Sequence, residues 1–342
     1  MGELSREQLA GQRLMVGFHG RKLSDDVRYL IDTLHVGGLI LFSRNIDYPE
    51  QITRLCADIQ QYAQQCGRPP LLIAIDQEGG QVKRLKPPFT QFPGNPAMTG
   101  VSDAIEFARV TAGELEQIGF NMNMAPVLDV APRDINSVMA GRAFGGDPEW
   151  VAEMGEHMIR EFQQHRIMAV AKHFPGIGRT TLDSHDDLPV FDADSDSLMA
   201  FDIKPFERAV TCQVAGMMLS HIRYSAIDPD WPASLSPAIV QGWLRDRLGY
   251  KGIVLTDDLD MGAITKHFDI RTVIRQIVAA DIDVALICHH RKHMETALET
   301  LLAAFDESPE MQRRMQRSTG RILKLKADYL DFDLATAIGI RE

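Results

Sequence analysis

The chain has 342 residues, of which 45% are hydrophobic and 24% are charged, and its formal net charge is −11. This composition is ordinary for a globular protein and argues against disorder. An acidic chain without clustered Lys and Arg does not favour nucleic acid or an anionic membrane surface as a partner. The length fits one barrel domain or two smaller domains.

The N-terminal residues include early acidic side chains and lack the apolar core of a signal peptide, and no stretch approaches the length of a membrane span. We therefore expect a cytoplasmic protein. The cysteines show no CxxC spacing, so we expect reduced structural residues and neither a disulfide framework nor a zinc site. They are Cys56, Cys66, Cys212 and Cys288.

Short apolar runs alternate with longer amphipathic segments. Eight runs are almost continuously apolar, as parallel strands covered on both faces must be. They lie at 14–18, 37–42, 71–76, 121–129, 167–174, 216–222, 252–258 and 283–288. We expect helices at 50–65, 102–118, 148–165, 197–212, 237–248, 268–280, 293–305 and 309–330. This alternation predicts an α/β fold, a closed (β/α)8 barrel.

No Pro-rich or Ser-rich linker and no repeat divides the chain, so we predict one domain over residues 1–342 with a C-terminal helix at about 309–330. An open dinucleotide-binding sheet would need a glycine fingerprint after the first strand. The segment GFHGRKL lacks that spacing. No cofactor is expected.

Polar side chains follow five of the runs at the same end. They are Asp76, Gln77 and Glu78 after the third run, Asp129 after the fourth, Lys172 and His173 in the fifth, His221 in the sixth, and Thr256, Asp257 and Asp258 in the seventh. In parallel barrels functional groups gather at the C-terminal ends of the strands, so this pattern predicts a convergent polar pocket. Taken singly, Asp129 could brace a loop and His221 could be a satisfied core histidine.

The fifth run leads into the segment AKHFPGIGRTTLDSHDDLP at 171–189. After Lys172 and His173 the following loop offers Asp183, His185 and two more aspartates. A buried strand with ionisable groups at its end and an acid-rich loop after it is typical of a barrel active site. The alternative is a polar surface loop with a satisfied histidine.

The turn DQEGG after the third run lets a ligand approach the backbone closely, and Asp76 could accept hydrogen bonds from hydroxyl groups. Arg84 and Arg142 are candidates for reaching the same pocket, although isolated arginines are also common on surfaces. The spacing of the histidines after the eighth run does not match a metal site, so a solvated loop is expected there. These histidines are His289, His290 and His293.

Six motifs occur in an order that resembles the single-domain bacterial β-N-acetylhexosaminidases of glycoside hydrolase family 3. They are DQEGGQVKRL, APVLDV, GRAFGGDP, KHFPGIGRTTLDSHDDLP, PASLSP and VLTDDLDMGAI, and the resemblance runs from about residue 10 to residue 330. The KHFPGxG…DSH loop separates this branch from the two-domain β-glucosidases of the family, which take their acid/base from outside the barrel.

The resemblance implies a role for each matched position. Asp257 matches the catalytic nucleophile, His185 the general acid/base, and Asp183 the partner of its imidazole. The positions that hold N-acetylglucosamine in the −1 subsite are matched by Asp76, Arg84, Arg142, Lys172 and His173. Such enzymes cleave terminal β-linked N-acetylglucosamine from cell-wall fragments during peptidoglycan recycling in the cytoplasm, with retention and without a metal. The implied partner is a small carbohydrate, and we expect a monomer.

These residue types suit those roles. A retaining glycosidase needs one group that attacks the anomeric carbon and another that protonates the leaving oxygen. A histidine, with an ordinary pKa of roughly 6.5, suits acid and base work near neutrality. Asp183 lies two residues before His185, so the two side chains can pair on an extended loop. Asp258 would point to the other face and have a structural role.

Two positions depart from the family pattern, with Ile177 in place of histidine and Gln81 in place of arginine. Gly176 and Gly178 flank Ile177 and are natural hinges. We therefore expect the loop at 175–188 to be displaced, with His185 far from Asp257, or poorly ordered when no sugar is bound. The alternative is a rigid loop with Ile177 packed in the barrel mouth.

Three other functions stay open. A sugar-binding or regulatory barrel without catalysis is disfavoured because Asp183, His185 and Asp257 are all present. A metal-dependent barrel hydrolase would use His173, His185 and His221 with aspartates as ligands. Within the family, a β-glucosidase is the alternative.

Overall fold

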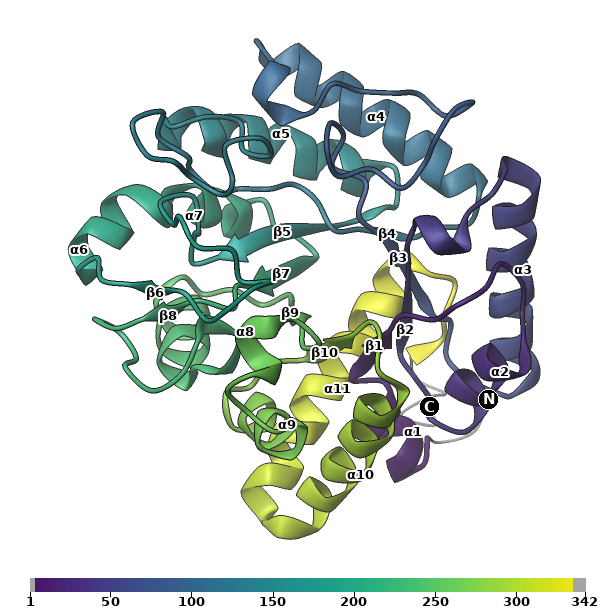
Figure 1. The fold of residues 1–342 in the computed structure, drawn as a ribbon. Coiled ribbons are helices and arrows are strands. Elements are labelled where there is room, and N and C mark those ends of the chain that lie inside the picture. Colours follow the sequence, from purple (N-terminus) through teal and green to yellow (C-terminus); the bar gives the residue numbers. More distant parts are fainter. Residues whose placement is uncertain (1–3, 335–342) are drawn as a thin grey trace.

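The computed structural model describes residues 4–334, in which eight strands close into a parallel barrel surrounded by helices (Figure 1). Around the barrel the order is β1, β10, β9, β7, β5, β4, β3 and β2, which confirms the predicted (β/α)8 fold. Each strand lies within one predicted run: β1 (Leu14–Val16), β2 (Gly38–Leu41), β3 (Leu72–Ile75), β4 (Met122–Asn123), β5 (Met168–Phe174), β7 (Gly216–Leu219), β9 (Ile253–Asp258) and β10 (Val284–Ile287).

The helices form the outer layer. They are α1 (Arg6–Gly11), α2 (Asp25–Asp32), α3 (Pro49–Gln65), α4 (Val101–Gln117), α5 (Pro148–Gln164), α7 (Lys204–Thr211), η5 (Ala238–Arg247), α9 (Ile270–Ala279), α10 (Arg291–Glu307) and α11 (Pro309–Tyr329), with the shorter α6 (Ser195–Ser197), η3 (Leu198–Asp202) and α8 (Gly262–Thr265). Every predicted helical segment contains a helix, whereas α1, α2 and α8 were not predicted. The one-domain prediction also includes residues 1–3 and 335–342, which lie outside the described residues.

Two elements differ from their predicted extent. The segment at 197–212 is divided, because the π-helical turn η3 precedes α7. A small parallel sheet of β6 (Val190–Phe191) and β8 (Arg223–Tyr224), which was not predicted, lies outside the barrel.

The run at 121–129 contains a strand of only two residues, because Pro126 has no backbone N–H and interrupts the ladder. The chain nevertheless stays beside β5. The Lys172 amide donates to the carbonyl of Pro126 at 3.1 Å, and the Leu128 amide donates to the carbonyl of Lys172 at 2.7 Å. This irregular pairing brings Asp129 to the C-terminal part of β5.

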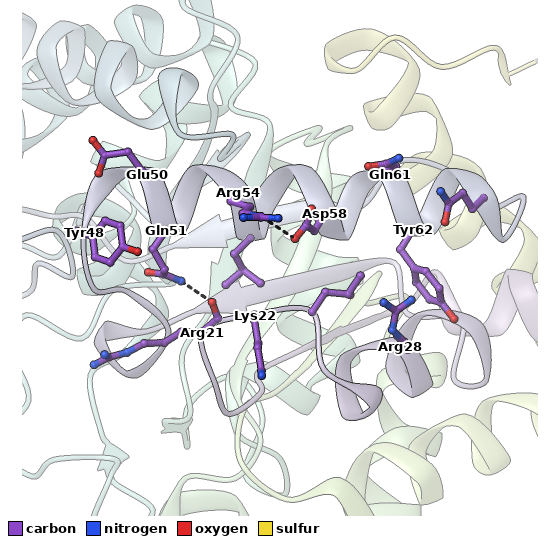
Figure 2. Close-up of a pocket in the computed structure, with 13 residues that line it drawn as sticks. Arg21, Lys22, Arg28, Tyr48, Glu50, Gln51, Arg54, Asp58, Gln61 and Tyr62 are labelled. Carbon is purple, nitrogen blue, oxygen red and sulfur yellow. Dashed lines mark hydrogen bonds and ion pairs between the residues drawn. The ribbon is translucent and has the colours of Figure 1, made fainter.

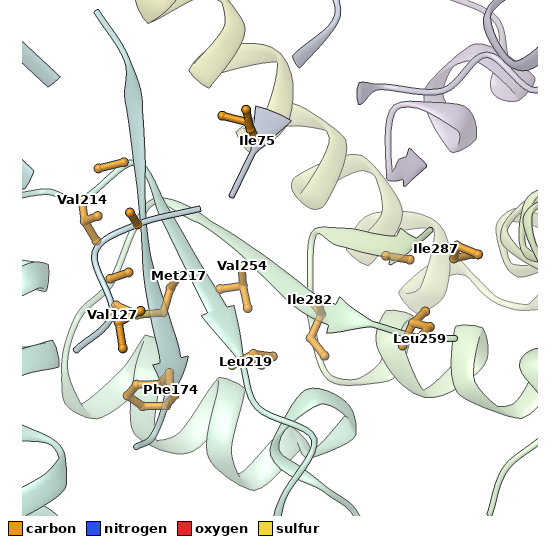
Figure 3. Packing of buried hydrophobic residues seen from close by; sticks show 14 of the residues in the cluster. Ile75, Val127, Phe174, Val214, Met217, Leu219, Val254, Leu259, Ile282 and Ile287 are labelled. Carbon is orange, nitrogen blue, oxygen red and sulfur yellow. The ribbon is translucent and has the colours of Figure 1, made fainter. Parts of the chain in front are cut away.

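Buried side chains alternate between two layers along the strands. One set, which includes Met15, Leu72 and Met168, takes residues from all eight strands and therefore fills the barrel interior. The other set packs between the strands and the helices, as Leu219 and Val254 do (Figure 3). All four cysteines are free. Among the described helices, none combines the length and the apolarity needed to cross a membrane.

A buried ionic network ties the strands to the outer helices. Asp283, just before β10, is fully buried and accepts hydrogen bonds from Arg245 of η5, from Arg321 of α11 and from the Val254 amide of β9, each at 2.8 Å. A buried carboxylate with this number of donors is strongly held. Its removal would leave the buried Arg245 without this carboxylate and Arg321 with Asp281 alone.

We expect Asp283→Ala to lower the free energy of unfolding by about 3–5 kcal/mol, because one partner of a buried charge network is lost. Urea denaturation followed by circular dichroism measures the change. The matched control is Asp306→Ala, since Asp306 pairs with Arg6 at an exposed site and should change stability little. Equal effects of the two substitutions would contradict the structural role of the network.

Candidate active site

The polar side chains at the strand ends meet in a cavity of about 380 Å³ at the C-terminal mouth of the barrel. Its lining includes most of the predicted site residues, namely Asp76, Arg84, Arg142, Lys172, His173, His185 and Asp257. Glu78, Asp258 and His289 line it as well, together with apolar side chains such as Phe42, Met218 and Leu286. The predicted convergence of these groups is therefore present.

Five charged groups form one connected cluster in this cavity. Lys172 Nζ lies 2.9 Å from Asp76 Oδ1 and 2.6 Å from Glu78 Oε1. Arg142 binds Glu78 with two nitrogens, at 2.7 and 3.0 Å, and Arg84 Nη2 lies 3.2 Å from Asp76 Oδ2. Burial opposes ionisation, but the charges of Lys172 and Arg84 outweigh it and lower the pKa of Asp76. Burial also opposes ionisation of Glu78 and Lys172, but the opposite charges around them outweigh it, so the pKa of Glu78 is lowered and that of Lys172 is raised.

His173 is fixed by a buried carboxylate. Its Nδ1 lies 2.7 Å from Asp129 Oδ2, and Asp129 is fully buried. The other oxygen of Asp129 accepts the Ile177 amide at 2.8 Å. Asp129 thus orients the imidazole and braces the start of the following loop, so that Nε2 is the ring nitrogen of His173 available to the cavity.

His185 and Asp183 pair as the sequence spacing predicts. His185 Nδ1 lies 2.7 Å from Asp183 Oδ1, which also accepts the His185 amide at 2.9 Å. Burial raises the pKa of Asp183, but the hydrogen bonds from His185 outweigh this and the pKa lies below its ordinary value. The pair leaves Nε2 of His185 free for a ligand.

Two neighbouring carboxylates at the end of β9 have different surroundings. Burial would raise the pKa of Asp257, but the charges of His173 and His221 and the Asp258 amide outweigh it, so the pKa is lowered. For Asp258, burial and the nearby charges of Asp260 and Asp257 raise the pKa to about 7. Asp258 also has the expected structural role, because Oδ1 accepts the Asp260 and Cys288 amides, each at 3.1 Å.

His221 is a satisfied core histidine. It is buried, with Nδ1 2.7 Å from Ser234 Oγ and Nε2 donating to the carbonyl of Asp258 at 2.9 Å. Burial lowers its pKa. Within residues 4–334 no group of three His, Cys, Asp or Glu side chains is arranged to hold a metal ion. The ligand set of the metal-dependent alternative is therefore not assembled in this part of the chain.

The loop at 175–188 is docked over the cavity, so the expectation of a displaced loop is wrong for this structure. His185 lines the same cavity as Asp257. The carbonyls of Ser184 and His185 accept the amides of Ala263 and Gly262 at the start of α8, at 3.1 and 3.2 Å. Ile177 is only 7% exposed, which corresponds to the alternative in which this side chain is packed at the barrel mouth.

Gly176 and Gly178, which were expected to be hinges, lie where the loop packs closely against other segments. Gly176 has φ of +119°, and a Cβ there would lie 2.8 Å from the Cβ of Asp202. A Cβ on Gly178 would lie 2.0 Å from the carbonyl oxygen of Val130. Sequence alone does not distinguish a glycine required for space from one required for movement. Gln81, the other departure, lies against Gly141, where a Cβ would be 1.6 Å from its Nε2.

Among the lining residues, Phe42 and His289 were not placed in the pocket from the sequence, and Glu78 was placed there without an assigned role. His289 follows a strand at the same end as the other site residues, so the strand-end rule that placed Glu78 could also have found His289. The prediction of a solvated loop after the eighth run is thus incomplete, because His289 is half-exposed but also borders the cavity.

A larger hollow lies on the outer surface between α3 and the segment that leads into α2 (Figure 2). It measures about 680 Å³, and Gln51 Nε2 donates to the carbonyl of Arg21 across it. The guanidinium of Arg28 covers the ring of Tyr62 at 4.6 Å. Although it is larger, this groove lacks the paired acids and histidines of the barrel mouth, so the smaller cavity is the candidate active site.

The sequence matches proteins of known families. The profile of the glycosyl hydrolase family 3 N-terminal domain matches residues 5–325. A Beta-hexosaminidase of Alkalilimnicola ehrlichii is 36% identical over 317 residues, which cover 90% of this chain and 88% of that protein. A Beta-hexosaminidase of Pseudomonas aeruginosa is 34% identical over 307 residues, which cover 89% of this chain and 90% of that protein. The chain belongs to glycosyl hydrolase family 3.

Solved structures of family 3 proteins are also similar. A β-N-acetylglucosaminidase of Paenibacillus sp. FPU-7 has a TM-score of 0.92 and 40% identity, and the match covers 96% of this chain and 64% of that chain. A β-N-acetylhexosaminidase of Beutenbergia cavernae has a TM-score of 0.88 and 27% identity, and the match covers 96% of this chain and 100% of that chain. This family 3 chain therefore spans less than two thirds of the Paenibacillus chain. The family and the glycoside hydrolase class predicted from the sequence are confirmed.

We expect Gly178→Ala to lower kcat/KM by about 10- to 100-fold, because the loop that holds His185 must shift away from Val130. Initial rates with an aryl glycoside measure the effect. The control is Gly113→Ala in α4, where a Cβ meets open space; it should keep activity and stabilise the fold by about 0.5–1 kcal/mol. Normal activity of Gly178→Ala would contradict the tight docking of the loop.

Proposed function

We propose that the chain is a retaining exo-β-N-acetylglucosaminidase that removes terminal β-linked N-acetylglucosamine from small glycans. The observation that carries the proposal is that Asp257 and His185 border one cavity, while Asp183 holds the His185 imidazole from behind at 2.7 Å. The names of the relatives, Beta-hexosaminidase and β-N-acetylglucosaminidase, support this sugar. We further propose peptidoglycan fragments as natural substrates, a cytoplasmic location and a monomeric enzyme.

In the first step, a carboxylate oxygen of Asp257 attacks the anomeric carbon of the bound sugar. The bond from that carbon to the glycosidic oxygen breaks, and protonated His185 transfers its Nε2 proton to the departing oxygen. A covalent ester between the sugar and Asp257 results. The lowered pKa of Asp257 favours this role, because the attacking group must be ionised.

In the second step, neutral His185 removes a proton from water while the water oxygen attacks the anomeric carbon. The ester bond breaks, Asp257 is released as a carboxylate, and the sugar leaves with its original configuration. Asp183 accepts the Nδ1 hydrogen bond throughout, which keeps Nε2 directed at the substrate and stabilises the imidazolium.

The charged cluster would bind the sugar in the −1 subsite. Asp76, Lys172 and Arg142 have fixed positions because each pairs with another member of the cluster. Hydroxyl groups both donate and accept hydrogen bonds, so a rigid array of carboxylate oxygens and cationic N–H groups suits them. Arg84 and His173 complete this subsite in our proposal.

The alternatives remain testable with simple substrates. Comparing 4-nitrophenyl β-glucoside with the corresponding β-N-acetylglucosaminide distinguishes the proposed enzyme from a β-glucosidase. A barrel that only binds sugar would cleave neither. Activity that survives EDTA would argue against the metal-dependent hydrolase.

Replacing the nucleophile tests the covalent mechanism. Asp257→Ala should reduce kcat by at least about 10³-fold while the protein stays folded, because the attacking group is lost. A slow fluorinated substrate should label Asp257 in the unchanged enzyme and leave the variant unlabelled, as peptide mass spectrometry would show. A label on Asp258 or Glu78 would show that the nucleophile is assigned wrongly.

Leaving-group dependence tests the acid. His185→Ala should slow substrates with poor leaving groups by about 10²- to 10⁴-fold and activated aryl glycosides much less, since only the former need protonation. Asp183→Ala should show a milder form of this pattern. Asp186→Ala, in the same loop, is the control and should resemble the unchanged enzyme. Equal losses on both substrate classes would argue against His185 as the acid.

A further inference from the structure

One wall of the catalytic cavity is built by residues that the proposed mechanism does not use. Phe42 follows β2 and His289 follows β10, and their ring centroids lie 5.9 Å apart. The guanidinium of Arg84 lies 5.6 Å from the Phe42 ring, so this wall adjoins the Asp76–Arg84 pair. Both residues border the main cavity.

This wall shares the main cavity with His185 but does not reach the recess beside that histidine. A small annex of about 50 Å³ beside His185 and Asp257 is lined by residues such as Met139, Ile177 and Thr180, and neither Phe42 nor His289 is among its lining residues. The scissile bond must lie near His185 and Asp257. Because C4 is opposite C1 in a pyranose ring, the wall with Phe42 and His289 is the part of the cavity that meets the C4 side of the sugar.

His289 is held firmly on this wall. Its amide donates to Asp260 Oδ2 at 2.7 Å, and the His290 amide donates to the same oxygen at 3.0 Å. Asp260 is itself fixed by His293 Nδ1 at 2.6 Å. The His289 ring lies beside Asp258, with Nε2 at an ion-pair distance of 3.3 Å from Asp258 Oδ2.

This arrangement leaves one ring nitrogen for a ligand. Among residues 4–334, His289 Nδ1 has no hydrogen-bond partner, and the side chain is 46% exposed. Nδ1 is an acceptor when the ring proton is on Nε2, beside the Asp258 carboxylate, and a donor when the proton is on Nδ1. A sugar hydroxyl suits both states, because it is both a donor and an acceptor.

We propose that His289 Nδ1 binds the 4-hydroxyl of the terminal sugar and selects its equatorial configuration. The inference rests on the proposed function, because it requires a β-glycoside in this cavity. It makes His289 a specificity-determining residue at the end of the sugar that is remote from the scissile bond.

The experiment compares the 4-nitrophenyl β-glycosides of N-acetylglucosamine and N-acetylgalactosamine, which differ only in the configuration at C4. His289→Ala should lower kcat/KM for the equatorial substrate by about 10-fold, the loss of one hydrogen bond, and change the axial substrate little. The ratio between the two substrates therefore falls. His290→Ala is the matched control, because the neighbouring histidine does not line the cavity.

Two further variants test which ring nitrogen of His289 binds the sugar hydroxyl. In His289→Asn the amide atoms are bonded to Cγ, as Nδ1 is in histidine, so this variant should keep most of the preference. In His289→Gln they are one bond further out, near the place of Nε2, and this variant should resemble His289→Ala. Thermal unfolding of each variant confirms that the protein is folded.

Several results would overturn the inference. One is an unchanged ratio of kcat/KM between the two substrates in His289→Ala, whether or not both values fall. Another is a preference for the equatorial substrate that His289→Gln keeps and His289→Asn loses. Failure of the proposed function gives a different result, because the unchanged enzyme would then hydrolyse neither acetamido sugar. If it cleaved only glucosides, the same variants would be compared on the glucoside and galactoside, which are also C4 epimers.

Discussion

The buried carboxylate of Asp129 connects the barrel to its catalytic loop. It follows the irregular end of β4, fixes the imidazole of His173 through one oxygen and receives the Ile177 amide on the other. A buried charge requires such partners, since an unpaired carboxylate in the protein interior is very costly. The position of the loop base is therefore set by the same interaction that orients a side chain of the proposed sugar subsite.

The remaining electrostatics of the site follow from how each carboxylate is surrounded. Asp76 and Glu78 share Lys172, and each has an additional arginine, so both stay ionised despite burial. Asp257 and Asp258 are adjacent in sequence, yet their pKa values shift in opposite directions. Neighbouring acids with such different environments can take different roles in one site. The proposed nucleophile is the one with the lowered pKa.

Much of the fold could be predicted because the length and periodicity of the apolar segments indicate which segments form strands and which form helices. All eight strands and the main helices lie where the alternation of apolar runs and amphipathic segments places them. The extent of β4 could not be predicted from the apolar run alone, because Pro126 interrupts the pairing within it. The site could be predicted as a region because parallel strands present their C-terminal ends together.

Individual contacts in the site depended on information that local sequence does not hold. The pairing of His289 with Asp258 requires that β9 and β10 be neighbours with a particular register. The glycines of the loop looked like hinges because their packing partners, Asp202 and Val130, come from other segments. Likewise, Ile177 could be placed only once its neighbours in the core were known.

The docked loop has two parts that differ in how strongly they are held. The base at 175–180 is largely buried, and within it Arg179 binds both oxygens of the buried Asp202. The arm at 181–187 is mostly exposed and is joined to α8 and the residues after it by backbone hydrogen bonds and an exposed pair between Asp187 and His267. Exposed ion pairs contribute little, whereas breaking buried ones costs several kcal/mol. Any movement that admits a sugar is therefore expected in the arm that carries His185, while Asp129 and His173 keep their places.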